Sequence, residues 1–138
     1  MSFHASGTFE VKLVPQPSDN PAAPLLARLL LDKQFHGELE ATSKGQMLSA
    51  GTATKGSAGY VAIEQVEGAL QGRRGSFVLQ HNGVMTRGDG KLTVAVVPDS
   101  GTGDLVGLAG TMTIRIESGK HYYGVDYTLE PVRPSAAG

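Results

Sequence analysis

Glu64 has the sequence setting of a residue that could transfer protons. If this segment is a strand, Glu64 lies on the same face as the apolar residues Tyr60, Ala62, Val66 and Leu70, because side chains two residues apart share a face. A carboxyl group on an apolar face that is buried has a raised pKa and can act as a general acid or base. In the alternative reading this face points outward and Glu64 is solvated or ion-paired, because Val61 and Ile63 on the opposite face are also apolar.

His81 is the second candidate for proton transfer. It alternates with Phe77 and Leu79 and precedes Asn82-Gly83, a dipeptide that favours a type I′ hairpin turn. A histidine at the inner end of a strand can exchange a proton near neutral pH. A histidine at the rim that bonds the backbone is the alternative. If both side chains face one cavity, Glu64 and His81 would form an acid–base pair.

The faces that carry this pair also supply two ligand contacts, Tyr60 beside Glu64 and Phe77 beside His81. Arg74, in a predicted turn at 71–75, could hold an anionic group or be a solvated turn residue.

The last predicted hairpin carries further polar side chains. Tyr122 and Asp126 alternate on one face, with His121 beside them, and a tyrosine next to a carboxylate can relay a proton. The alternative is an outward polar face that flanks an apolar one. We include His121, Tyr122 and Asp126 among the candidate ligand-binding residues.

No metal or cofactor site is predicted. The chain has no cysteine, and its four histidines are far apart in the sequence. The glycines at 101, 103, 107 and 110 lack the Lys-Ser/Thr of a phosphate-binding loop and a helix to follow it. We interpret them as turn and close-packing positions.

The elements that must position these residues are short strands. Apolar and polar residues alternate over residues 8–13. Similar runs separated by turn residues follow at 46–54, 60–70, 76–81, 91–97, 106–116 and 122–130. Residues 22–40 are ambiguous. Their alternation favours a strand, but residues 24–31, with a proline near the start, could form a short helix.

Short turns force neighbouring strands to run antiparallel, because parallel pairs need long crossovers. About eight strands in one small domain must close or sandwich to remove their edges. We therefore predict an all-β protein whose residues 1–130 form a closed antiparallel β-barrel of about eight strands. Residues 131–138 are predicted to be a frayed tail.

Charge and hydropathy exclude several kinds of partner. The net charge is −1 and no basic stripe is present, so neither nucleic acid nor a membrane surface is expected as a partner. The run Leu29-Leu30-Leu31 is far shorter than the ~20 residues of a membrane span. The N-terminus shows no signal-peptide pattern, so we expect a cytoplasmic protein.

Five blocks of the sequence carry a family resemblance that runs nearly end to end: residues 35–43, 59–64, 72–81, 97–105 and 121–127. In this order they resemble the domain-of-unknown-function 3224 family of small bacterial proteins. The resemblance implies a barrel of the allene oxide cyclase-like group, and it supplies no function. Residues 22–31 are richer in Ala and Leu than is typical of the family.

Three functions remain open from the sequence. The first is a barrel that binds a small apolar or amphipathic molecule. The second is an isomerase or cyclase acting on such a molecule, with Glu64 and His81 as the acid–base pair. The third is a structural or self-association module. Apolar residues on both faces of residues 61–70 and 91–97 indicate a covered outer surface, so a homo-oligomer is expected in all three cases.

Overall fold

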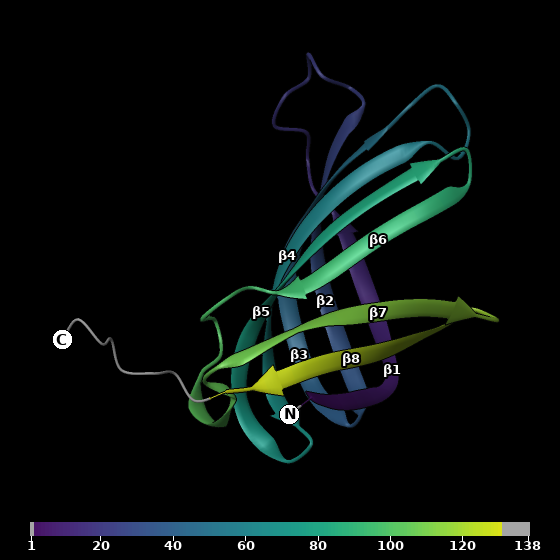
Figure 1. The fold of residues 1–138 in the computed structure, drawn as a ribbon. Coiled ribbons are helices and arrows are strands. Elements are labelled where there is room, and N and C mark those ends of the chain that lie inside the picture. The colour runs from purple at the N-terminus through teal and green to yellow at the C-terminus, as the bar shows by residue number, and fades with distance from the viewer. Residues whose placement is uncertain (1, 131–138) are drawn as a thin grey trace, which may run out of the picture.

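The computed structural model describes residues 2–130, which form eight strands and one short 3-10 helix (Figure 1). Each strand pairs antiparallel with the next, and the last pairs with the first, so the predicted closed antiparallel barrel is confirmed. The strands are β1 (Ser2–Pro15), β2 (Leu26–Gly37), β3 (Leu39–Gly51), β4 (Ala58–Leu70), β5 (Arg73–Thr86), β6 (Asp89–Val96), β7 (Leu108–Glu117) and β8 (Lys120–Leu129), and the helix is η1 (Gly103–Leu105).

The strands are staggered around the barrel. The backbone partners can be followed around the barrel from Ala5 in β1, through β8, β7, β6, β5, β4, β3 and β2 in turn. The path returns to β1 at Pro15, ten residues further along. A stagger of this kind tilts the strands against the barrel axis. Inward side chains therefore meet along diagonals of the sheet, and residues from strands that are not neighbours can lie at one height.

The leucine-rich stretch 22–40 contains no helix, so the helical alternative for residues 24–31 is wrong. β2 begins at Leu26 and pairs with β1 on one side and β3 on the other. This pairing outweighs the helix propensity of leucine. The chain reverses at Glu38, after Gly37 with a φ of 108°, so residues 22–40 hold all of β2 and the start of β3 rather than one strand.

The prediction of a turn at Asn82-Gly83 is also wrong. β5 continues to Thr86, and the chain reverses at Arg87 and Gly88, whose φ angles are 48° and 91°. Gly83 pairs with Tyr60 in β4, and a Cβ on Gly83 would lie 2.2 Å from an atom of the Tyr60 ring. The glycine therefore serves to accommodate an aromatic ring across the strand pair rather than to form a turn.

One end of the barrel, which we call the base, is tightly filled. It carries the turns at Glu38 and at Gln71–Gly72, together with the 97–107 connection that contains η1. Large side chains are fully buried there, namely Phe35, Leu39, Leu70, Leu105, Leu108 and Tyr127. The opposite end, which carries the loops at 16–25 and 52–57, we call the mouth.

The mouth is split on both sides of the β7–β8 hairpin. Within residues 2–130, β6 and β7 pair only at Val94–Met112 and Ala95–Thr111, and the β1–β8 pairing stops at Phe9–His121. In Figure 1, β6 diverges from β7 on the mouth side of this short contact. As a result, four inward-facing apolar side chains remain between 42% and 63% exposed: Leu13, Met85, Leu92 and Ile116.

Tyr123 ties the base together. Its hydroxyl accepts a hydrogen bond from the backbone N–H of Leu39 at 2.8 Å and lies within donating distance of the carbonyls of His36 and Leu39, at 2.9 and 3.1 Å. A side chain of β8 thus satisfies backbone groups at the β2–β3 turn, on the far side of β1.

Replacing Tyr123 with phenylalanine should lower the free energy of unfolding by about 1–3 kcal/mol, because the buried N–H of Leu39 loses its partner. Urea unfolding of the purified variant measures this. Tyr122→Phe is the matched control, since the Tyr122 hydroxyl makes no hydrogen bond among the described residues and its loss should cost under about 0.5 kcal/mol. Equal losses in the two variants would contradict the assigned role of Tyr123.

Candidate functional site

Three ionisable side chains meet inside the barrel, next to the packed base on the side that faces the mouth. Glu64 Oε2 lies 2.8 Å from Lys33 Nζ and 3.1 Å from His81 Nε2. All three side chains are buried, and Glu64 is 0% exposed. We call Lys33, Glu64 and His81 the interior triad. The structure brings together the two residues that the sequence proposed as an acid–base pair and adds a cation.

Gly45 makes this meeting possible. Lys33 is on β2 and Glu64 on β4, with β3 between them, and Gly45 is the β3 residue paired with Glu64. A Cβ on Gly45 would lie 2.2 Å from the carbonyl oxygen of Ile63 and 2.7 Å from Glu64 Cα. Because β3 carries no side chain at this position, its inner surface there leaves room for lysine and glutamate to meet across it.

Aromatic rings surround the lysine end of the triad. Lys33 Nζ lies 5.0 Å from the centroid of the Phe9 ring and 5.7 Å from that of Phe35. Both distances are within the range of a cation–π interaction. The ammonium group is therefore stabilised by one carboxylate and two ring faces in place of water.

Glu64 is the negative member of the triad. Burial raises its pKa, but the hydrogen bond from His81 and the charge and hydrogen bond of Lys33 together outweigh burial and leave the pKa below its ordinary value. An ionised carboxylate only accepts hydrogen bonds, so His81 Nε2 carries the donated proton. In neutral His81 the other ring nitrogen, Nδ1, is then an acceptor.

The polar network inside the barrel is incomplete. Glu64 Oε1 and the hydroxyl of Ser43 are buried and have no hydrogen-bond partner among the described residues. Ser43 pairs with Lys33 across the β2–β3 ladder, so both unpartnered atoms belong to the neighbourhood of the triad. Unpaired buried polar atoms are uncommon in native proteins and cost stability.

Tyr60 faces inward on the mouth side of the triad. It is four residues before Glu64 on the same face of β4 and is only partly buried. Burial and the charge of Glu64 both raise the pKa of its hydroxyl, so Tyr60 stays a neutral hydrogen-bonding group. His121 also faces inward at the mouth, and its ring centroid lies 5.1 Å from that of Phe9. Phe77, by contrast, is buried in the core.

The remaining predicted site residues lie outside the barrel. Arg74 belongs to β5, not to a turn, and is exposed near the base. Tyr122 and Asp126 are on the outer face, as the alternative reading expected, and they do not contact each other. Asp126 accepts a hydrogen bond from His4 Nδ1 at 2.8 Å, whereas the Tyr122 ring packs against the Arg115 guanidinium at 4.8 Å.

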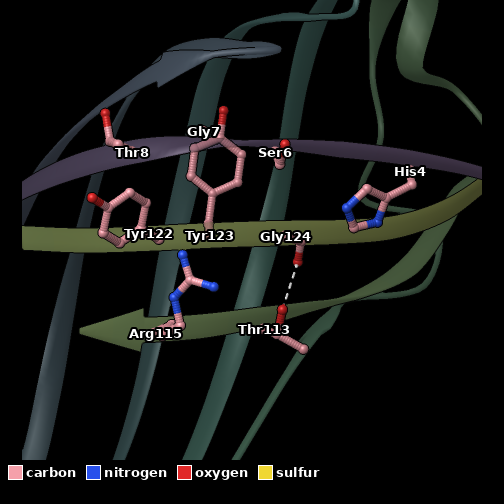
Figure 2. Close-up of a pocket in the computed structure, with 9 residues that line it drawn as sticks. All are labelled: His4, Ser6, Gly7, Thr8, Thr113, Arg115, Tyr122, Tyr123 and Gly124. Atoms are coloured by element: carbon pink, nitrogen blue, oxygen red, sulfur yellow. Dashed lines mark hydrogen bonds between the residues drawn. The ribbon is translucent and has the colours of Figure 1, made fainter. Parts of the chain in front are cut away.

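Figure 2 shows the outer groove to which Tyr122 belongs. It has a volume of about 450 Å³, and Thr113, Arg115 and Tyr122 line it together with side chains of β1. Gly124 separates Tyr122 from the His4 end of the groove, and the Thr113 hydroxyl bonds the Gly124 carbonyl at 3.4 Å. Because Asp126 pairs with His4 and Tyr122 with Arg115, the proton relay that the sequence left open is not formed.

Lys33 is the site residue that sequence reasoning missed. It occupies an inward position of β2 between Leu31 and Phe35. The signal that could have found it is an ionisable residue that alternates with apolar residues on one face of a strand. The same reasoning singled out Glu64 on β4. Two opposite charges on apolar faces of different strands are a signal for a buried ion pair.

Residues 2–130 contain neither a metal-ligand cluster nor a membrane-spanning helix. No group of three or more His, Asp or Glu side chains gathers where it could hold an ion. No helix in this range is long and apolar enough to cross a bilayer.

Replacing Lys33 with methionine should lower the free energy of unfolding by about 3–5 kcal/mol, because it leaves the Glu64 carboxylate buried without its cation. The exposed pair Lys44–Asp32 is the matched control: its atoms are 3.0 Å apart, but its side chains are 80% and 52% exposed. Lys44→Met should cost under about 1 kcal/mol. Chemical denaturation compares the two, and similar losses would contradict a structural role for the buried pair.

Glu64 should also make stability depend on pH. Its pKa is lower in the folded protein than the ordinary 4.5. The unfolded chain therefore binds the proton more readily, and the stability due to Glu64 is present above about pH 4.5 and lost as the pH falls through the folded pKa. The difference in unfolding free energy between wild type and Glu64→Gln should shrink below pH 4.5. Glu67→Gln, on the outer face of β4, is the control, and a difference that does not change with pH would contradict this assignment.

Comparisons with known proteins agree with the fold and add no activity. The model of a family described as "Protein of unknown function (DUF3224)" matches residues 5–127. A crystal structure of a protein with unknown function from this family, from Shewanella oneidensis MR-1, is 54% identical, with a TM-score of 0.91 over 96% of this chain and 100% of that chain. No curated protein matches the sequence. The chain belongs to the DUF3224 family.

Proposed function

We propose that the protein is a binding barrel that holds a small apolar or amphipathic molecule in its mouth. The observation that carries this proposal is the exposure of inward-facing apolar side chains at one end of an otherwise filled barrel. Leu13, Met85, Leu92 and Ile116 are between 42% and 63% exposed although they continue the core-facing alternation of their strands. Covering such surface is favourable by roughly 25 cal/mol per Å².

The depth of the binding region follows from burial. The interior triad is closed to solvent, since Lys33, Glu64 and His81 are all buried. A ligand would therefore rest above the triad and contact the mouth-lining side chains without entering the base. The triad supports this floor by fixing β2, β4 and β5 to one another.

Two polar groups suit an amphipathic ligand over a purely apolar one. Tyr60 and His121 both face inward at the mouth and are only partly buried. The Tyr60 hydroxyl makes no hydrogen bond among the described residues, so it is available to a polar atom of a ligand. A few polar groups on an apolar wall are typical of small-molecule sites.

Arginine in place of Leu92 should weaken ligand binding by about tenfold or more, because it places a charge on the apolar wall. The uncharged fluorescent dyes N-phenyl-1-naphthylamine and 1-aminoanthracene serve as probes, because neither can form an ion pair with the introduced arginine. Native mass spectrometry of protein purified from cells detects a retained molecule. Leu48→Arg is the matched control, since Leu48 is 55% exposed on the outer face. If neither probe binds wild type, or if both variants bind as wild type does, the proposal fails.

One observation favours a second function, an isomerase or cyclase. The hydrogen bond between Glu64 and His81 is the arrangement in which a carboxylate orients an imidazole for proton transfer. Because Glu64 is ionised and paired with Lys33, His81 would be the proton-transferring group and Glu64 its orienting partner. Chemical change of a retained molecule by wild type, and not by His81→Gln, would establish this activity in place of simple binding.

A further inference from the structure

We propose that the outer surface of β2–β5 on the mouth side is the contact between two copies of this chain. Six large apolar side chains, here called the outer apolar face, are exposed on it: Leu26, Leu30, Leu48, Val61, Ile63 and Val84. Their strands are neighbours in the sheet, so the side chains form one surface. Contiguous apolar surface of this kind is uncommon on proteins that remain monomeric.

The outer apolar face carries both a groove and the side chains that could fill one. Leu48 and Val61 are directly paired across β3 and β4, and Leu48, Val61 and Ile63 are between 50% and 56% exposed. A groove of about 670 Å³ runs beside them, and Gly45, Gln46 and Gln80 are among the residues that line it. A two-fold contact requires one surface to complement itself, and a ridge next to a groove does so when the second copy is rotated by half a turn.

The charges around this face favour a second copy over other occupants. The cross-strand partners of Ile63 are Gln46 on β3 and Gln80 on β5, and the partner of Val61 on β5 is Asn82. Amide side chains both donate and accept hydrogen bonds, so they can pair with the same residues of an identical chain. Arg28 is the one charged side chain lining the groove, and it is bonded to Asp19 at 2.8 Å. A membrane or nucleic acid would instead call for unpaired basic residues.

This interface is independent of the proposed ligand site. The two surfaces use opposite faces of the sheet: on β4, Val61 and Ile63 point outward, whereas Tyr60 and the buried Ala62 point inward. A dimer formed through the outer apolar face therefore leaves the mouth open. The two proposals can fail separately.

Sedimentation velocity of the full chain at micromolar concentration tests the proposal. Wild type should sediment at twice the chain mass of 14.4 kDa. Leu48→Arg and Ile63→Arg should each raise the dimer dissociation constant by about a hundredfold, because every dimer carries the substitution twice on a face that must lose water. Leu92→Arg, at the mouth, should leave the dimer intact. Circular dichroism confirms that each variant is folded.

Three results would overturn this interface. A wild-type monomer at micromolar concentration rules out the dimer. Dimers that survive both Leu48→Arg and Ile63→Arg place the contact elsewhere. Dissociation by Leu92→Arg alone makes the mouth the contact between copies and would also weaken the case for a ligand there.

Discussion

The charge of Glu64 is the constraint on which the interior depends. A carboxylate closed to water must be compensated within the protein, and here that requires Lys33 from β2 and His81 from β5 at fixed distances. The stagger of the strands brings these residues to one height, and Gly45 leaves the space in which they meet. A slip of one residue in any of these strand pairs would turn a member of the triad outward. The triad therefore specifies the register of the barrel as well as its interior chemistry.

The fold could be predicted from the sequence because period-two alternation repeats along the chain. The errors came from residues whose role is set by distant neighbours. Gly83 was expected to form a turn, but it lies opposite the Tyr60 ring in the middle of a strand pair. Residues 24–31 permit a helix locally, and only pairing with β1 and β3 makes them a strand. Neither cause is visible in the residues themselves.

The candidate site was predicted in part. Alternation identified Glu64 and His81 as ionisable groups on apolar faces, and the structure brings them into contact. The alternation could not show that Lys33 reaches Glu64, because that contact depends on the tilt of the strands and on Gly45. The sequence also could not decide which face of β8 points into the barrel. That choice separates His121, at the mouth, from Tyr122 and Asp126, which lie outside.

The short contact between β6 and β7 gives the barrel a weak seam. Only two residue pairs join these strands in the described part of the chain, whereas every other neighbouring pair is joined by eight or more. Strand edges that lack a partner must satisfy their backbone groups with water. Amide hydrogens at this seam should therefore exchange with solvent sooner than those of β3 and β4, and thermal opening of the barrel begins where its circumference is least bonded.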